Sequence, residues 1–171
     1  FERALQWLLA FQDRDGGWAA FDKGVTAPWL EHVPFADHNA IIDPTCSDLT
    51  GRVLELLGLI GHPREDPVVR RAIAMIRRTQ EPDGSWYGRW GVNYIYGTWQ
   101  VLRGLAAIGE NMNQEWIRRG RDRVRAACRC GAACNGITQC PTLRSPTRIA
   151  RPRPGPGWQS WLPFIYRLGS F

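Results

Sequence analysis

The chain contains an internal repeat, and this repeat constrains the fold more than any other feature of the sequence. Residues 4–18 return as residues 72–86, at a constant offset of 68 positions. Self-similarity at a fixed offset is typical of folds that stack one supersecondary unit against the next. Apart from Ala4 and Ala72, the residues common to both copies are Gln12 and Gln80, Asp15 and Asp83, Gly16 and Gly84, and Trp18 and Trp86.

Each copy reads as an apolar helix with a glutamine near its C-terminal end, then a tight Asp-Gly turn and a tryptophan. Glycine can take a positive φ in such a turn, and aspartate can bond its own backbone. A glutamine at this place can reach the unpaired carbonyls of a helix end or the amides of a neighbouring helix. With the indole stacked on that glutamine, we interpret the unit as a structural staple between helices and not as a reaction centre.

Helical patterns also occupy most of the sequence around the copies. Apolar periodicity predicts a helix over residues 45–61, one that begins at Asp66-Pro67, one over residues 94–108 closed by Gly109, and one from Gln114 onward. Residues 19–44 form a long connection that three prolines interrupt, and a connection of that length is usually functional. The sequence therefore predicts an all-α protein built from helix pairs.

Charge divides the chain into two parts. The formal net charge is +6, but residues 1–122 carry 14 basic and all 16 acidic side chains, while residues 123–171 carry eight arginines and no acid. The basic character belongs to the second part alone, so no nucleic-acid surface is expected on the first. We predict a folded segment over residues 1–122 and an Arg/Pro/Cys-rich tail over residues 123–171.

The composition of this tail is unusual for a folded domain. A third copy of the repeat is expected near residue 130, because Trp116 opens an approach helix, yet no such copy follows. Enrichment in Arg, Pro, Gly, Ala and Cys is what GC-rich DNA encodes in a wrong reading frame. We hypothesise a frameshift near codon 123; the alternative is a genuine disordered basic extension.

Metal and membrane signals are weak. Four of the five cysteines lie in the tail, at Cys128, Cys130, Cys134 and Cys140, without zinc spacing and with no histidine beyond His62. We expect no metal and no cofactor. No apolar run is long enough to span a bilayer and no secretory signal is present. The chain starts at Phe1 within an amphipathic pattern, which suggests a start inside a longer protein.

Three stretches together resemble the squalene–hopene cyclases: the repeated Gln…Asp-Gly-x-Trp unit, residues 33–44 and residues 88–98. The unit is similar to the QW motif of triterpene cyclases, and the other two stretches look specific for the bacterial squalene–hopene branch. The resemblance covers residues 1–122. It implies a partial α/α barrel, a toroid of helix pairs, from the barrel that carries the initiating acid.

The resemblance also implies the reaction and its partners. Family members cyclise squalene to hopene or hopanol by proton-initiated polyene cyclisation in hopanoid biosynthesis. They attach as monotopic proteins to the cytoplasmic face of a bacterial membrane, and homodimers are expected. Aromatic faces suit this chemistry because their quadrupoles attract cations without offering a lone pair.

Five residues match the family's cavity and the surroundings of its acid. Trp90 and Tyr96 match cavity aromatics, and Phe21 falls where members carry an aromatic residue, often tyrosine. Asp48 matches a carboxylate behind the acid motif, and Arg52 falls where some members place a histidine that bonds the acid. Without the family, the aromatics read as core residues, and Asp48 with Arg52 reads as an i, i+4 ion pair.

A second group of matches lies in the long connection. Phe35 and Ala36 match the constriction between substrate channel and cavity, and Asp37 and His38 sit beside it. His38 alone reads as a loop residue. His32 and His62 are interpreted as structural.

The family's proton donor lies in an Asp-x-Asp-Asp motif, which the 171 residues do not contain. The nearest string, at residues 13–16, belongs to the first repeat unit. The acid is therefore expected upstream of Phe1, and the chain alone is expected to be inactive.

Several other classes stay open at this point. One is a related barrel enzyme, such as an oxidosqualene cyclase, a class II diterpene cyclase or a protein prenyltransferase, although zinc ligands for the last are missing. Another is a non-enzymatic module that binds carbohydrate through tryptophans, which predicts strand alternation where the sequence has helical periodicity. A third is a truncated product without function.

Overall fold

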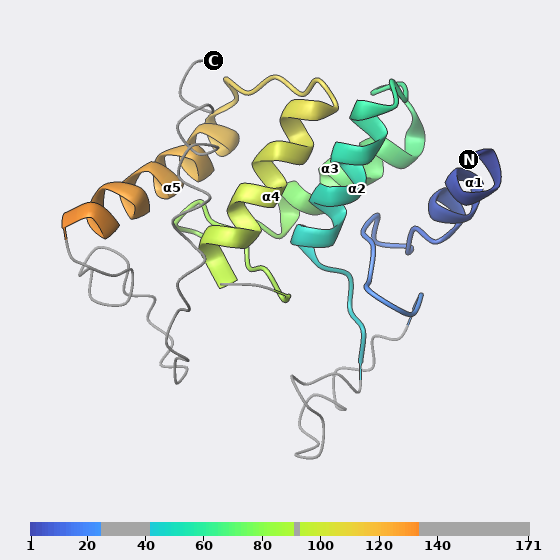
Figure 1. Ribbon diagram of the computed structural model, residues 1–171, viewed down its shortest axis with the longest axis horizontal. Coiled ribbons are helices and arrows are strands. Elements are labelled where there is room, and N and C mark those ends of the chain that lie inside the picture. The colour runs from blue at the N-terminus through green and yellow to red at the C-terminus, as the bar shows by residue number, and fades with distance from the viewer. Residues whose placement is uncertain (25–41, 91–92, 134–171) are drawn as a thin grey trace. The chain divides into compact units, whose positions relative to one another are not determined.

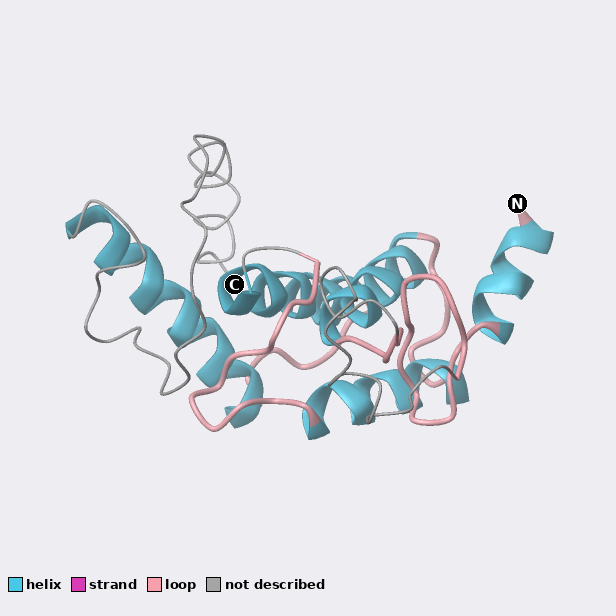
Figure 2. Ribbon diagram, turned by 90° about the horizontal axis from the view of Figure 1, so that it is seen from below, coloured by secondary structure: helices cyan, strands magenta, loops and turns pink. Residues whose placement is uncertain are grey.

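The computed structural model describes residues 1–24, 42–90 and 93–133. These residues form five α-helices joined by turns and loops, with no strand among them (Figure 1, Figure 2). The helices are α1 (Glu2–Ala10), α2 (Ser47–Leu59), α3 (Pro67–Arg78), α4 (Asn93–Ala107) and α5 (Glu115–Ala133). The prediction of an all-α fold is confirmed. Helix α5 runs across residue 122, where we placed the boundary of the folded segment.

The helix ends follow the signals in the sequence. The Asp66 side chain accepts a hydrogen bond from the Val68 amide at 2.7 Å, so it caps α3, and Pro67 is the first residue of that helix. Gly61 and Gly109 end α2 and α4 with φ angles of +72° and +79°. In each case the next amide bonds back to a carbonyl five residues earlier, at 2.9 Å, which satisfies a carbonyl that the helix leaves free.

Helix α2 packs against α4 more extensively than any other pair of helices in the described residues, and the two lie side by side (Figure 1). Three glycines line this contact: Gly51 and Gly58, seven residues apart on α2, and Gly104 on α4. A Cβ on Gly104 would overlap the carbonyl of Gly51, and a Cβ on Gly51 would lie 2.7 Å from the carbonyl oxygen of Gln100. The two backbones are therefore in direct contact.

The first copy of the repeat joins α1 to α3. The side-chain amide of Gln12 donates to the carbonyl of Gly16 at 2.9 Å and to the carbonyl of Val68, in the first turn of α3, at 2.8 Å. Its oxygen accepts from Arg71 of the same helix. The Trp18 indole donates to the Leu8 carbonyl at 2.9 Å, back in α1.

The second copy makes the same contacts between α3 and α5. Gln80 donates to the carbonyls of Gly84 and Trp116 at 2.9 and 2.7 Å and accepts from Arg119 at 3.2 Å. The Trp86 indole donates to the Ile76 carbonyl at 2.7 Å. We call each arrangement a glutamine clamp. Both clamps reach a carbonyl of a later helix and not an amide; stacking of the indole on the glutamine stays a prediction.

The Asp-Gly turns are built alike as well. Asp15 and Asp83 each accept a hydrogen bond from the backbone amide two residues on, at 2.9 and 3.0 Å. Burial raises the pKa of Asp83, but hydrogen bonds from Ser85 and Arg123 outweigh it and lower the pKa below its usual range. Since a lowered pKa favours the folded state above the usual titration range, this contribution is lost as the pH falls.

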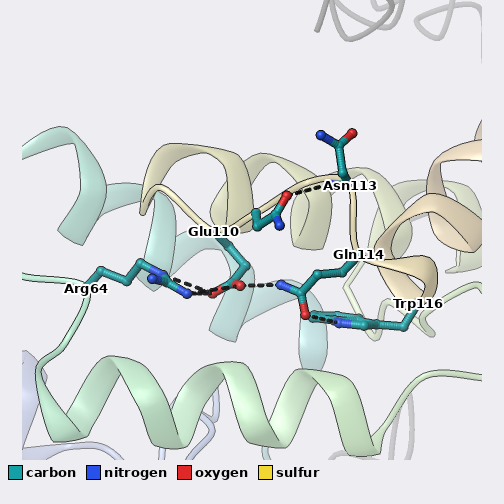
Figure 3. A network of polar contacts seen from close by, with 6 residues as sticks. Arg64, Glu110, Asn113, Gln114 and Trp116 are labelled. Atoms are coloured by element: carbon teal, nitrogen blue, oxygen red, sulfur yellow. Dashed lines mark hydrogen bonds and ion pairs between the residues drawn. The ribbon is translucent and has the colours of Figure 1, made fainter.

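A polar network connects the two tight helix junctions (Figure 3). Arg64, between α2 and α3, donates to both carboxylate oxygens of Glu110, between α4 and α5, at 3.1 and 3.2 Å. The Gln114 amide donates to the same carboxylate and accepts from the Trp116 indole at 3.0 Å. The bidentate pair is largely buried on the glutamate side, which favours a fixed geometry over a solvated contact.

The core lies between these helices. Trp18 and Trp86 are fully buried, together with aliphatic side chains from α2, α3, α4 and α5. The largest of these side chains are Leu54, Leu57, Met75, Ile76, Leu105 and Ile117. Helix α1 has no buried residue, so its Trp7–Phe11 stack lies at the surface of the described part.

The glycine contact between α2 and α4 predicts the sign of one substitution. Helix propensity alone makes Gly104→Ala stabilising by about 1 kcal/mol. Because the added methyl group overlaps the Gly51 backbone, we expect a net loss of about 1–3 kcal/mol in the free energy of unfolding, measured by chemical denaturation.

The control is Ala106→Ser on the exposed side of α4, which we expect to change the free energy of unfolding by about 0.5 kcal/mol or less. A Gly104→Ala chain that is more stable than the unaltered chain would contradict the direct contact between the two backbones.

Candidate functional site

An apolar groove of about 360 Å³ runs between α1, the segment after the first clamp, α2 and the loop before α4. Arg52 is its one charged lining residue in the described part of the chain. The other lining residues are aromatic or aliphatic: Trp7, Leu8, Phe11, Trp18, Ala19, Ala20, Leu49, Val53, Leu56 and Trp90. A groove of this kind suits a hydrocarbon ligand.

Two predicted cavity aromatics are in contact, and one of them, Trp90, lines the groove. The rings of Phe21 and Trp90 make an edge-to-face contact with centroids 5.5 Å apart and planes at 87°. Their residues are 71% and 39% exposed, so both rings offer free surface despite the contact. The Arg89 guanidinium lies 5.9 Å from the Trp90 ring. An edge-to-face pair holds its rings at a fixed angle, which is useful for shaping a ligand surface.

Arg52 connects this groove to Tyr96 on α4. Its Nη2 donates to the Tyr96 hydroxyl at 2.8 Å, and its guanidinium carbon lies 5.7 Å from the centre of that ring. Arg52 forms no ion pair with Asp48 in the described part of the chain, although the two are four residues apart on α2. The ordinary ion pair that the spacing suggested is therefore wrong, because the arginine crosses to the neighbouring helix.

Asp48 is fully buried at the start of α2. Its Oδ2 accepts from the Trp90 amide at 3.3 Å, while its Oδ1 has no hydrogen-bond partner among the described residues. A buried carboxylate oxygen without a donor is costly, by about 1–3 kcal/mol or more. Burial, and then the charge of Asp48, raise the pKa of the neighbouring Cys46 thiol well above its usual range. Among the described residues, Oδ1 of Asp48 is therefore a buried acceptor without a donor.

One residue that holds this site together was missed from the sequence. The buried carboxylate of Asp43 accepts hydrogen bonds from three successive backbone amides. The amides of Ala20 and Asp22 lie at 3.1 and 2.8 Å, and the amide of Phe21 between them also donates to it. Three backbone donors around one carboxylate fix the local chain direction. Asp43 therefore sets the position from which Phe21 reaches Trp90. The motif at residues 33–44 contains Asp43, but nothing in its spacing points to this role.

The structure thus brings the five predicted residues near one another, in a cluster that we call the wall. Phe21 contacts Trp90, whose amide bonds Asp48, and Arg52 bonds Tyr96. Of the five, Trp90 and Arg52 line the groove. Phe35, Ala36, Asp37 and His38, with His32, lie outside the described residues. A second, larger hollow of about 540 Å³ is bordered by Cys46, Thr79 and Arg89 and includes none of the predicted catalytic or substrate-binding residues. No group of three or more metal-ligating side chains occurs within the ranges that the structure describes.

Comparison with known proteins decides the family. Residues 1–132 match the family model described as the squalene-hopene cyclase C-terminal domain. The chain belongs to the squalene–hopene cyclase family. The matched residues include both glutamine clamps, the groove and all five residues of the described wall.

Curated relatives of the squalene–hopene cyclase family agree with this match. The squalene-hopene cyclase of Schizosaccharomyces japonicus is 47% identical over 108 residues, which are 63% of this chain and 16% of that protein. The probable squalene–hopene cyclase of Sinorhizobium fredii is 47% identical over 118 residues, 68% of this chain and 18% of that protein. The squalene–hopene cyclase of Alicyclobacillus acidocaldarius is 43% identical over 107 residues, 63% and 17% respectively. The chain spans less than a fifth of each relative.

The role of Asp43 predicts a local effect of removing its charge. In Asp43→Asn the amide side chain no longer offers a charged acceptor to three amides, so residues 20–22 should open more easily. We expect hydrogen exchange of the Phe21 amide to become roughly 30-fold faster, equivalent to about 2 kcal/mol. Asp22→Asn makes the same change at an exposed position and serves as the control. Equal exchange in both variants would show that Asp43 does not hold this segment.

Proposed function

We propose that the chain forms part of the cavity wall of a squalene–hopene cyclase, which converts squalene to hopene or hopanol. The observation that supports this most is the single wall made by Phe21, Trp90, Tyr96 and Arg52 beside a fully buried Asp48. These residues come from four separate segments, and ordinary core packing does not require aromatic rings to stay partly exposed along an apolar groove.

The reaction explains why such a wall is needed. An acid transfers a proton to a terminal alkene of squalene, and the cation then moves along the polyene as each ring closes. Loss of a proton ends the sequence in hopene, and capture of water ends it in hopanol. Aromatic faces stabilise each cation by about 2 kcal/mol when water is excluded, and they do not trap it. Trp90, Tyr96 and Phe21 are proposed to act in this way.

The proton donor is proposed to come from another part of the whole protein. The 171 residues contain no Asp-x-Asp-Asp motif. Arg52 is exposed and has no carboxylate partner in the described segments, so it can receive a carboxylate from elsewhere. Arg52 is proposed to orient and acidify the donor carboxylate, since arginine stays charged at every working pH. Phe35, Ala36, Asp37 and His38 are proposed to form the channel constriction.

The location and assembly of the whole enzyme are proposals as well. A water-insoluble substrate is most accessible from a membrane surface, and we propose attachment to one leaflet at the cytoplasmic face, with homodimers. None of the described helices is long and apolar enough to cross a bilayer.

A chimera tests the proposed function. The aligned 107 residues of the Alicyclobacillus cyclase are replaced by those of this chain, and squalene turnover is followed by mass spectrometry. We expect hopene. In the chimera, Trp90→Ala should lower the rate by roughly 30-fold, about 2 kcal/mol, and release partly cyclised products, while Trp90→Phe retains most activity.

The outcomes against the proposal are specific. A chimera that melts at the temperature of the parent enzyme yet forms no hopene contradicts a role of this wall in cyclisation. The chain alone should form no hopene, and hopene from the isolated chain would contradict the proposal that the acid lies elsewhere.

A further inference from the structure

Arg52 has a second partner besides Tyr96. With its amide oxygen turned toward the guanidinium, Gln100 accepts a hydrogen bond from Nη2 at 3.1 Å and another from Nε. This orientation is required because a guanidinium only donates hydrogen bonds, so the group that faces it has to be the oxygen. Gln100 is only 3% exposed, and it has no counterpart among the residues that the sequence singled out.

The position of Gln100 explains why it can do this. Tyr96 and Gln100 are four residues apart on α4, so their side chains lie on one face of the helix. Arg52 comes from α2, directly after Gly51, whose backbone abuts the Gln100 carbonyl. The absence of a side chain at Gly51 lets the helices approach until the guanidinium reaches both acceptors. The close helix contact and the arginine site are therefore one feature of the fold.

The two acceptors leave part of the guanidinium unused. Nε and Nη2 are bonded to Gln100 and Tyr96, whereas Nη1 has no hydrogen-bond partner among the described residues. Both acceptors are neutral, so neither compensates the positive charge of Arg52, which is an exposed residue. A planar fork fixed at one edge is well placed to receive a carboxylate at its other nitrogen.

We propose that Gln100 is a positioning residue: it holds the Arg52 guanidinium so that Nη1 is presented to a carboxylate from outside the described residues. This rests on the proposed function, in which that carboxylate is the proton donor. Leucine at position 100 would leave Arg52 charged but free to turn. Glutamate would again accept the hydrogen bonds from Nε and Nη2 of Arg52, but its negative charge would compensate that of the guanidinium. Comparing the two substitutions therefore distinguishes the effect of holding Arg52 in position from the effect of its charge.

The first test uses the 171-residue chain itself and does not depend on activity. The chain is labelled with ¹⁵N, and the Nε–H signal of Arg52 is assigned by its loss in Arg52→Lys. We expect a slowly exchanging signal, at least about tenfold faster exchange in Gln100→Leu, and recovered protection in Gln100→Glu. Tyr96→Phe removes an acceptor of Nη2 only and should leave the Nε–H protected.

Exchange in Gln100→Leu equal to that of the unaltered chain overturns the proposal. So does an unprotected Arg52 signal in the unaltered chain. Backbone amides of α4 are measured in the same samples, because a loss of packing would accelerate them together with the arginine signal. Acceleration of both to the same extent would also overturn a specific role for Gln100.

The second test uses the chimera of the preceding section. Gln100→Leu should lower kcat about tenfold with the KM for squalene unchanged, since Gln100 is buried and does not line the groove. Gln100→Glu should not recover kcat although it recovers the Nε–H protection. Full activity of Gln100→Leu overturns the proposal. A chimera without activity beside the expected exchange results would contradict the proposed function and leave the positioning of Arg52 by Gln100 established.

Discussion

The arrangement of the helices depends on the side-chain amides of two glutamines, Gln12 and Gln80. In each glutamine clamp, the two N–H groups of one amide bridge the Asp-Gly turn of one helix and the first turn of a later helix. Glutamate has no donors for this, and asparagine is one carbon shorter. Because the arginine three residues after the bonded carbonyl returns a hydrogen bond to the amide oxygen, every polar atom of the glutamine side chain is used. The relative position of α1, α3 and α5 depends on these two groups.

The clamps also position the aromatic residues of the wall. The Trp18 and Trp86 amides donate to the hydroxyls of Thr50 on α2 and Thr98 on α4, so each clamp is tied to one helix of the close glycine contact. Phe21 follows the first of these tryptophans by three residues and Trp90 follows the second by four. The repeat thus places one aromatic ring after each clamp, and the close packing of α2 on α4 brings the two rings together. The structural repeat thus positions the aromatic residues for which we propose a role in ligand binding.

The sequence was sufficient to predict features within one helix, but not the side-chain contacts between helices. Signals such as Pro67 at a helix start and Gly109 at a helix end act on their own helix, so these ends were predictable. The cap that Asp66 forms became clear only in the structure. The i, i+4 spacing of Asp48 and Arg52 suggested an ion pair, but Arg52 instead reaches α4, which no helical spacing reveals. Asp43 and Gln100 were missed because their partners are backbone amides and a guanidinium distant in sequence. The assignments of residues 35–38 and the frameshifted tail stay predictions.

The most direct measurement of the central claim is the stability of Gln80→Leu. Leucine keeps the apolar part of the side chain but removes both donated hydrogen bonds, to the carbonyls of Gly84 and Trp116. The account predicts that chemical denaturation gives a free energy of unfolding lower by about 2–4 kcal/mol. Gln6→Leu, the same change at an exposed position of α1, should cost about 0.5 kcal/mol or less. Equal stabilities of the two variants would contradict a fold organised by the glutamine clamps.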